Sequence, residues 1–213
     1  MYLVFEGPNK VGKTAALRQI VPKLEKAGFR VTVSREPGGT KLGQQLRGIL
    51  LDPRNERMSP KVDMLLFTAD RMHLMDVLFG EDAERYDIVI VDRSFISTVV
   101  FQYYANGLPA DEFLNLIDLL RLKTPDLVIH VTAGAKTLMR RRQDKKALEV
   151  DHFETLGLEY EQRVIDGYFK ASNLPMFKGK WVTFDGEQPL DVVHEQIYVE
   201  ILQRITQFRN EAG

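Results

Sequence analysis

The order of apolar and polar segments along the chain predicts strands and helices in alternation. Five short apolar runs have the length of buried strands, at residues 2–5, 30–34, 88–91, 127–131 and 181–184. Segments with a helical repeat separate them, at residues 13–27, 41–51, 60–79, 94–105, 111–122, 136–142, 153–171 and 190–208. Strands that alternate with helices form parallel sheets covered on both faces. We therefore expect an α/β fold of three layers, with a five-stranded parallel sheet flanked by helices.

No segment rich in Gly, Ser or Pro divides the chain, so we expect one domain over residues 1–213. A basic run departs from the regular core pattern, because it has little apolar support. It consists of Arg140, Arg141, Arg142, Lys145 and Lys146. Such a run is typical of a solvated helix end, and we expect a short, mobile charged segment here.

Composition excludes several classes of protein. The 213 residues are 44% hydrophobic and 28% charged, which is typical of a globular protein. The formal net charge of −1 argues against a nucleic-acid partner bound through a basic surface. Cysteine is absent, which excludes disulfides and thiolate metal sites. The N-terminus does not resemble a signal peptide, and no apolar run approaches the ~20 residues that span a bilayer. We expect a cytoplasmic protein without a membrane partner.

The most specific motif in the chain follows the first predicted strand and opens the first predicted helix. It satisfies Gly-x-x-x-x-Gly-Lys-Thr with Gly7, Pro8, Asn9, Lys10, Val11, Gly12, Lys13 and Thr14. Glycines in this pattern let backbone N–H groups point at phosphate oxygens, and the helix N-terminus attracts anions. The motif predicts a P-loop that binds the phosphates of a nucleoside triphosphate, with Lys13 at the β- and γ-phosphates and the Thr14 hydroxyl on Mg²⁺.

Asp92 ends the apolar strand at residues 88–91 and is the second candidate metal residue. If that strand lies beside the P-loop strand, the carboxylate can hold Mg²⁺ through water. The same residue is also a good N-cap for the following helix, and both roles are compatible.

A P-loop does not by itself identify the acceptor of the phosphoryl group. Residues 136–144 lack the Asn-Lys-x-Asp motif of GTPases, and large ATPases need a longer chain. A small-molecule kinase remains. An anionic acceptor needs cations rather than a base, and cations follow most predicted strands. They are Arg35, Arg47, Arg71, Arg93 and the arginines of residues 140–142.

Motifs along nearly the whole chain resemble those of thymidylate kinases. They are Phe5-Glu6-Gly7-Pro8, Arg35-Glu36-Pro37-Gly38-Gly39-Thr40, Leu65-Leu66-Phe67-Thr68-Ala69-Asp70-Arg71, Asp92-Arg93, Ser97-Thr98, Gln102, Pro125-Asp126-Leu127 and Asp151-x-x-Glu154. The motif at residues 35–40 is highly specific. The resemblance implies a P-loop NTPase fold and a homodimer formed through residues 62–79. It also implies phosphorylation of dTMP to dTDP with ATP and Mg²⁺, in dTTP biosynthesis.

The resemblance also implies roles for individual residues. Phe67 stacks on thymine and Arg71 bonds a thymine carbonyl, while Thr98 and Gln102 contact the pyrimidine edge. The remaining contacts to dTMP are implied for Asn9, Glu36, Pro37, Arg47, Arg93, Ser97 and Phe101. A lid over the triphosphate is expected at residues 140–154. The catalytic cations are expected to be Lys13, Arg93, Lys10 and, from the lid, Arg142.

Four positions depart from the family pattern. Asn9 replaces an acid that reaches the sugar 3′-hydroxyl, and Lys10 stands where one branch has arginine. Ser94 replaces an aromatic residue or histidine, and His152 replaces a lid arginine.

These departures leave two alternatives open. A deoxynucleoside kinase would use Glu36 as a base and is favoured by the Asp-Arg-Ser sequence at residues 92–94. The lack of a Trp shortly after residue 37 argues against it. A nucleotide-binding regulator without activity is the other alternative, suggested by Asn9 and His152.

Overall fold

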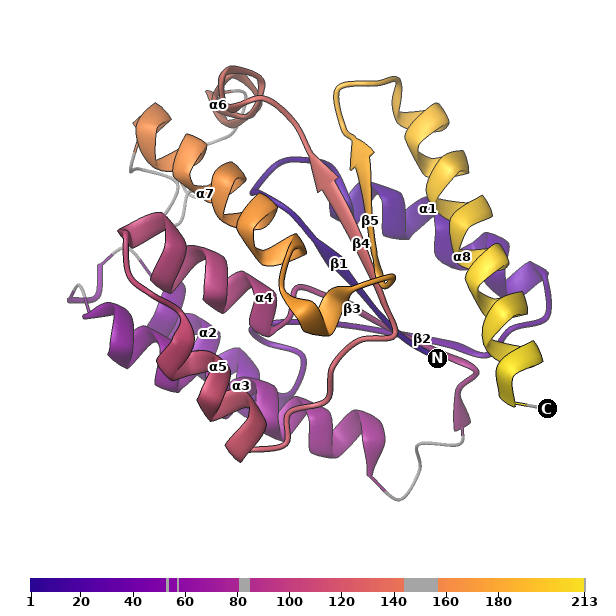
Figure 1. Ribbon diagram of the computed structural model, residues 1–213, viewed down its shortest axis with the longest axis horizontal. Coiled ribbons are helices and arrows are strands. Elements are labelled where there is room, and N and C mark those ends of the chain that lie inside the picture. Colours follow the sequence, from indigo (N-terminus) through magenta and orange to yellow (C-terminus); the bar gives the residue numbers. More distant parts are fainter. Residues whose placement is uncertain (53, 57, 81–84, 144–156, 213) are drawn as a thin grey trace.

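The centre of the molecule is a parallel sheet with the strand order β2-β3-β1-β4-β5 (Figure 1). The computed structural model describes the chain except for residues 53, 57, 81–84, 144–156 and 213. The strands are β1 (Tyr2–Glu6), β2 (Val31–Arg35), β3 (Ile88–Asp92), β4 (Leu127–Thr132) and β5 (Trp181–Asp185). Each predicted strand agrees with the observed one to within one residue at either end. The predicted α/β fold with a five-stranded parallel sheet is confirmed.

Helices cover both faces of this sheet, because successive side chains of the inner strands point to opposite sides and both sets are apolar. On one face, Leu3 and Ile90 join the core beneath α1 (Lys13–Lys26) and α8 (Leu190–Ala212) (Figure 1). On the other face, Val4 and Val91 pack beneath a second group of helices. This group contains α3 (Pro60–Phe79), α4 (Phe95–Thr98), α5 (Asp111–Leu119) and α7 (Gly157–Ser172), with α2 (Lys41–Leu51) packed on α3.

The segment predicted as one helix at residues 94–105 is three short pieces, which corrects that prediction. After α4 the chain forms a π-helix, η2 (Val99–Tyr103), and then a 3₁₀ turn, η3 (Tyr104–Asn106). The spacing of apolar residues cannot distinguish these helix types. A short segment buries nearly the same positions whether its backbone hydrogen bonds span four residues, as in an α-helix, or five, as in a π-helix. The π-helix is wider than an α-helix and is frequent at functional sites. Here it shapes the wall that carries Thr98, Phe101 and Gln102.

The connection that follows β4 lies beside the carboxyl end of the sheet. It begins with α6 (Ala135–Gln143), near the start of α7 (Figure 1). Of the expected lid at residues 140–154, residues 144–154 lie outside the described residues, and with them Lys145, Lys146 and His152. A 3₁₀ turn, η6 (Pro175–Phe177), leads from α7 to β5. In the described part of the chain, no helix has both the length and the apolar character needed to cross a membrane.

Candidate active site

The P-loop connects β1 to α1 and passes very close to strand β4. Gly7 has φ +138°, and a Cβ at this position would lie 2.0 Å from the carbonyl oxygen of Val131. Only glycine can make this approach, because both the backbone conformation and the space exclude a side chain. Gly12, with φ +114°, then precedes the first turn of α1. The loop therefore ends at a helix N-terminus, where free N–H groups and the helix dipole favour an anion.

Lys13 lies across this loop in the described structure. Its Nζ donates to the carbonyl oxygens of Gly7, at 2.9 Å, and of Pro8, at 3.1 Å. Burial, together with the positive charge of nearby Arg93, lowers the pKa of Lys13 to about 7. An anion bound in the loop would stabilise the protonated amine and raise this pKa again. The protonation of Lys13 should therefore depend on whether an anion occupies the loop.

Thr14 and Asp92 provide hard oxygen ligands beside the P-loop. The Thr14 hydroxyl donates to Oδ2 of Asp92 over 3.4 Å, and the β1–β3 register places Asp92 next to Phe5. The buried Oδ1 of Asp92 has no hydrogen-bond partner among the described residues. The same residues contain no cluster of three or more acidic or histidine side chains that could hold a metal alone. These oxygens fit Mg²⁺, which typically uses one or two protein ligands and completes its shell with water and phosphate.

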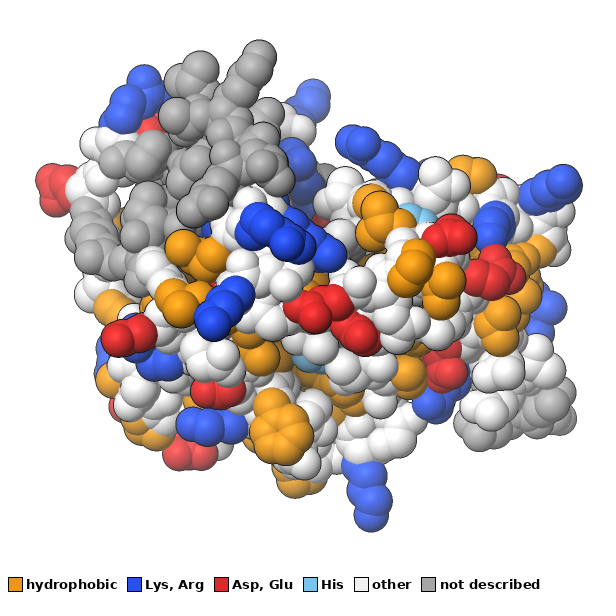
Figure 2. Space-filling model, turned by 90° about the horizontal axis from the view of Figure 1, so that it is seen from above, with side chains coloured by type: hydrophobic (Ala, Val, Ile, Leu, Met, Phe, Trp, Pro, Cys, Tyr) orange, Lys and Arg blue, Asp and Glu red, His pale blue; other side chains and the backbone are white. Residues whose placement is uncertain are grey.

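A wide cavity, called here the P-loop cavity, opens at the carboxyl ends of the strands. It is lined by Asn9, Lys10, Gly12, Lys13, Thr14, Ala15, Arg18, Arg35, Glu36, Arg47, Asp92, Arg93 and Arg141. Lys and Arg outnumber the two acids in this lining, so the cavity suits a highly charged anion. Figure 2 looks onto this edge of the sheet and shows several basic side chains on it, with acidic and apolar side chains among them. The formal net charge is near zero, so the excess of cations is a local property of the site.

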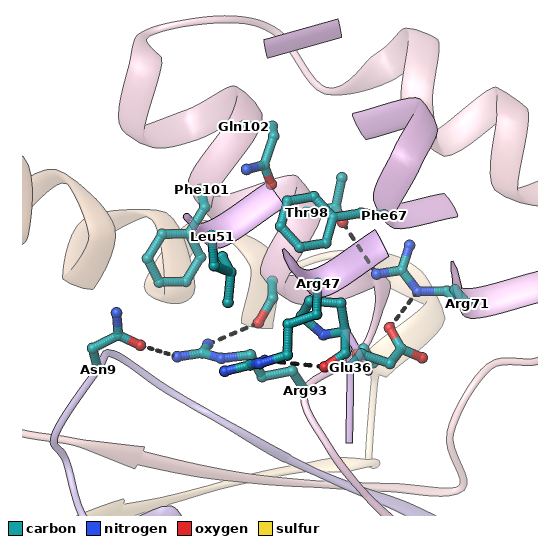
Figure 3. A pocket seen from close by; sticks show the side chains of 13 residues that line it. Asn9, Glu36, Arg47, Leu51, Phe67, Arg71, Arg93, Thr98, Phe101 and Gln102 are labelled. Atoms are coloured by element: carbon teal, nitrogen blue, oxygen red, sulfur yellow. Dashed lines mark hydrogen bonds and ion pairs between the residues drawn. The ribbon is translucent and has the colours of Figure 1, made fainter. Parts of the chain in front are cut away.

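A second cavity, called here the inner cavity, lies between α2, α3 and the α4–η2 segment. It is lined by Asn9, Glu36, Pro37, Arg47, Leu51, Phe67, Arg71, Arg93, Ser94, Ser97, Thr98, Phe101 and Gln102. Every residue predicted to contact the acceptor is in this set, although the residues come from distant parts of the chain. Figure 3 shows Phe67 and Phe101 pointing into the same space from different helices. The inner cavity therefore offers aromatic surfaces together with a few polar groups, as ligand sites for a planar molecule do.

Polar groups at one end of the inner cavity are joined by Arg71. Its Nε donates to Oε2 of Glu36 at 2.7 Å, and one of its two terminal nitrogens, Nη2, donates to the Thr98 hydroxyl at 3.1 Å (Figure 3). The third nitrogen, Nη1, is buried and has no hydrogen-bond partner in the described structure. Burial raises the pKa of Glu36 to about 7, although the charge of Arg71 opposes the rise. A buried donor without a partner is costly, so a ligand oxygen that accepts from Nη1 would be favoured here.

Arg93 lies where the two cavities meet and lines both of them. Its backbone is left-handed, with φ +76°, which turns the side chain back toward the P-loop. Nη1 donates to the Gly7 carbonyl at 3.1 Å and to the Ser97 hydroxyl at 3.0 Å, while Nη2 donates to Oδ1 of Asn9 (Figure 3). The guanidinium also lies 5.2 Å from the centre of the Phe101 ring. It is therefore held from several sides at the boundary between the cavities.

The arginines of α6 lie in different surroundings. Arg141 lines the P-loop cavity, and its Nη2 donates to the carbonyl of Gly186 at 2.8 Å. Arg142, the cation favoured by the sequence analysis, lines neither cavity and is paired with the buried carboxylate of Glu161 on α7. Arg140 also lines neither cavity. In the conformation described, Arg141 is therefore the arginine of α6 nearest to the phosphate-binding surface.

Sequence reasoning assigned no role to several residues of this site. Leu51 and Ser94 line the inner cavity, and Glu6 and Tyr168 lie beneath Arg93 in its hydrogen-bond network. Glu6 had a usable signal, because an acid at the end of a buried strand needs partners. Tyr168 had none, since an aromatic residue on the inner side of a helix is indistinguishable from core.

Comparison with known proteins agrees with this geometry. Residues 5–197 match the family model described as Thymidylate kinase. The thymidylate kinase of Thermoanaerobacter sp. strain X514 is 33% identical over 197 residues, which cover 92% of this chain and 94% of that protein. The one from Enterococcus faecalis is 30% identical over 208 residues, covering 96% of each chain. A family match of this extent, with relatives aligned along most of their length, places the chain in the thymidylate kinase family.

Proposed function

We propose that the protein transfers the γ-phosphoryl group of ATP to dTMP, giving dTDP and ADP. The observation that supports this most is the junction of the two cavities. Asn9, Glu36, Arg47 and Arg93 line both, so a nucleotide in the inner cavity has its phosphate beside a triphosphate in the P-loop cavity. This is the arrangement that direct transfer between two phosphates requires.

The chemical step needs positioning and charge rather than a base. An oxygen of the dTMP phosphate forms a new bond to the γ-phosphorus while the bond from that phosphorus to the β–γ bridging oxygen breaks. Both partners are anionic, so Arg93 at the junction and Lys13 in the loop offset their repulsion and stabilise charge on the transferring group. Glu36, which a nucleoside kinase would need as a base, is bonded to Arg71 through Oε2.

Thr14 and Asp92 are the residues that we propose for Mg²⁺. Bound Mg²⁺ supplies positive charge at the β- and γ-phosphate oxygens and helps to align the triphosphate. The support is the pair of oxygens 3.4 Å apart and the Asp92 oxygen that is buried without a protein partner in the described structure. The hydrogen bond between Thr14 and Asp92 joins the end of the P-loop to β3. The remaining positions around the ion would be filled by water and phosphate oxygens.

Base selection is proposed to come from the part of the inner cavity that Arg71, Thr98 and Gln102 line. The unpartnered nitrogen of Arg71 is a donor for a thymine carbonyl, and Thr98 and Gln102 present polar groups to the base edge. Phe67 offers a stacking surface for the ring. A pocket that hydrogen-bonds one base edge leaves buried groups unpaired with another base, and dTMP should be preferred to dCMP and dGMP.

Of the remaining proposed catalytic cations, Lys10 lies in the P-loop cavity, and α6 contributes one more from the expected lid. Arg142 was expected there, but it can reach the phosphates only after its ion pair with Glu161 is broken. Arg141 needs no such step, because it already lines the cavity. We propose that α6 supplies its charge through Arg141 in the arrangement described.

The test of the proposed function is a coupled ADP assay with purified protein, ATP and Mg²⁺. Reactions contain dTMP, thymidine, dCMP, dGMP or no acceptor. The proposal requires turnover with dTMP well above the others, and loss of almost all of it in Lys13→Ala, which rules out a contaminating kinase. Preference for thymidine would favour the nucleoside kinase, and no turnover with any acceptor would favour the inactive regulator.

We also propose a homodimer that forms through α3 and acts in the cytoplasm. Apolar side chains on this helix are exposed along one stripe: Val62, Leu65, Met72 and Val77 are 43%, 56%, 39% and 59% accessible. An exposed stripe of this kind is typical of a surface that another chain covers. Sedimentation equilibrium should give twice the 24.5 kDa mass of one chain, and Leu65→Glu should reduce it to that of the monomer.

A further inference from the structure

The carboxylate of Glu6 is completely buried at the end of β1, directly before the P-loop. It accepts four hydrogen bonds. Oε1 receives them from the backbone N–H and the hydroxyl of Ser94, at 2.7 and 2.8 Å. Oε2 receives them from the hydroxyls of Ser97, at 2.7 Å, and Tyr168, at 3.0 Å. All four hydrogen bonds therefore come from α4, from Ser94 as the N-cap residue of α4, and from α7. Glu6 lines neither cavity.

The two hydroxyls bonded to Oε2 are also acceptors for Arg93. Nη1 of Arg93 lies 3.0 Å from the Ser97 oxygen and 3.2 Å from the Tyr168 oxygen. A hydroxyl has one proton, and the direction of that proton decides whether the oxygen presents a lone pair or a donor to its neighbour. The Glu6 carboxylate accepts at both contacts, which directs the two protons toward Oε2. The other acceptor near the Tyr168 hydroxyl, the carbonyl oxygen of Gly7, is farther away, at 3.2 Å against 3.0 Å. The lone pairs of Ser97 and Tyr168 are then left to face the guanidinium.

We propose that Glu6 is a positioning residue for phosphate recognition, acting on Arg93 through Ser97 and Tyr168. The inference rests on the proposed function, in which Arg93 meets the phosphate of dTMP. Glu6 sets the polarity of the hydroxyl pair, and the hydroxyl pair holds Nη1 of Arg93 at the junction of the cavities. A carboxamide of the same shape would donate to one hydroxyl, turn its proton toward Arg93 and displace the guanidinium.

The test separates an effect on the phosphate from a general loss of structure. Binding of dTMP and of thymidine, which lacks the phosphate, is measured by calorimetry for wild type and Glu6→Gln. A charged hydrogen-bond network of this kind predicts a loss of dTMP affinity of roughly tenfold. Thymidine affinity should stay within about twofold, because the base end of the inner cavity is unchanged. Equal losses for both ligands, or no loss for dTMP, would overturn the proposal.

Two further measurements complete the design. In an Arg93→Ala background, Glu6→Gln should cause no additional loss of dTMP affinity, and a full additional loss would show that Glu6 acts elsewhere. Tyr168→Phe keeps the ring but removes one acceptor, so it should weaken dTMP and spare thymidine. It decides the question by the same criterion if Glu6→Gln does not fold. Wild-type protein that binds no dTMP would instead reject the proposed function itself.

Discussion

Glu36 and Arg71 form a buried ion pair between two segments that are 35 residues apart, with 2.7 Å between Oε2 and Nε. Their side chains are 2% and 3% exposed. A buried pair is no guarantee of net stability, but removing one partner leaves an uncompensated charge. This pair therefore couples the stability of the fold to the organisation of the inner cavity.

The first prediction follows from that burial. Glu36→Ala should lower the free energy of unfolding by about 3 kcal/mol, because it leaves Arg71 charged and without its carboxylate. Urea denaturation measures the change. The matched control is Glu112→Ala, which breaks the exposed ion pair with Lys61 and should leave the midpoint where it is. Similar shifts in both variants would show that burial is not the cause.

The second prediction concerns the neighbouring arginines of α6. Arg141→Ala should lower kcat by roughly tenfold or more with a smaller effect on the KM of dTMP, because the proposed contact of Arg141 is to the transferring end of the triphosphate. Arg142→Ala should mainly lower thermal stability, because it removes the ion-pair partner of a buried carboxylate, that of Glu161.

The two variants are matched, since they differ by one position on the same helix. Steady-state kinetics together with a melting curve for each distinguishes the roles. A large fall in kcat for Arg142→Ala with normal turnover for Arg141→Ala would mean that the ion pair with Glu161 breaks during catalysis.

The third prediction uses the pKa of Lys13, which burial lowers to about 7 in the free protein. At pH 8 most of this amine is neutral, and phosphates in the loop favour its charged form. Binding of ADP should therefore take up a proton from the buffer. Calorimetry in buffers with different ionisation enthalpies measures the uptake, and equal observed enthalpies would contradict it.

Glu36 provides the control for this experiment. The pKa of Glu36 is raised to about 7 by burial, and it also lines the P-loop cavity, so it too is able to gain a proton when an anion binds. If Lys13 is the source of the uptake, Glu36→Gln should take up as much as wild type. Loss of the uptake in that variant would assign it to the carboxyl group.

The fourth prediction concerns Asn9, whose Oδ1 accepts a hydrogen bond from Arg93. Its amide group remains a donor, whereas an aspartate here would only accept and would repel anions nearby. We expect Asn9→Asp to favour dTMP, which carries a 3′-hydroxyl, over a 3′-azido analogue more strongly than wild type does. The ratio of kcat/KM for the two substrates measures this preference. A ratio that does not move toward dTMP in the mutant would rule the idea out.

The sequence alone was sufficient wherever the signal is local. Residues 7–14 are contiguous, so the P-loop motif can be recognised without any knowledge of packing. The strands were found because a strand buried on both faces is an uninterrupted apolar run between turns. Most residues of the inner cavity, though not Leu51 and Ser94, could be named in advance through motifs that resemble a family. No spacing along the chain indicates that residues 36, 71 and 98 meet.

Tertiary structure decided what depends on the relative placement of distant segments. The strand order places Asp92 beside the P-loop. This order could not be predicted, because the five apolar runs are similar in length and composition and do not indicate which strands become neighbours. The choice between Arg141 and Arg142 has the same origin. Adjacent residues on a helix point about 100° apart, and the packing of α6 on α7 selects the one that faces the phosphate-binding surface. Glu6 and Tyr168 are 162 positions apart, and only the folded chain brings them together beneath Arg93.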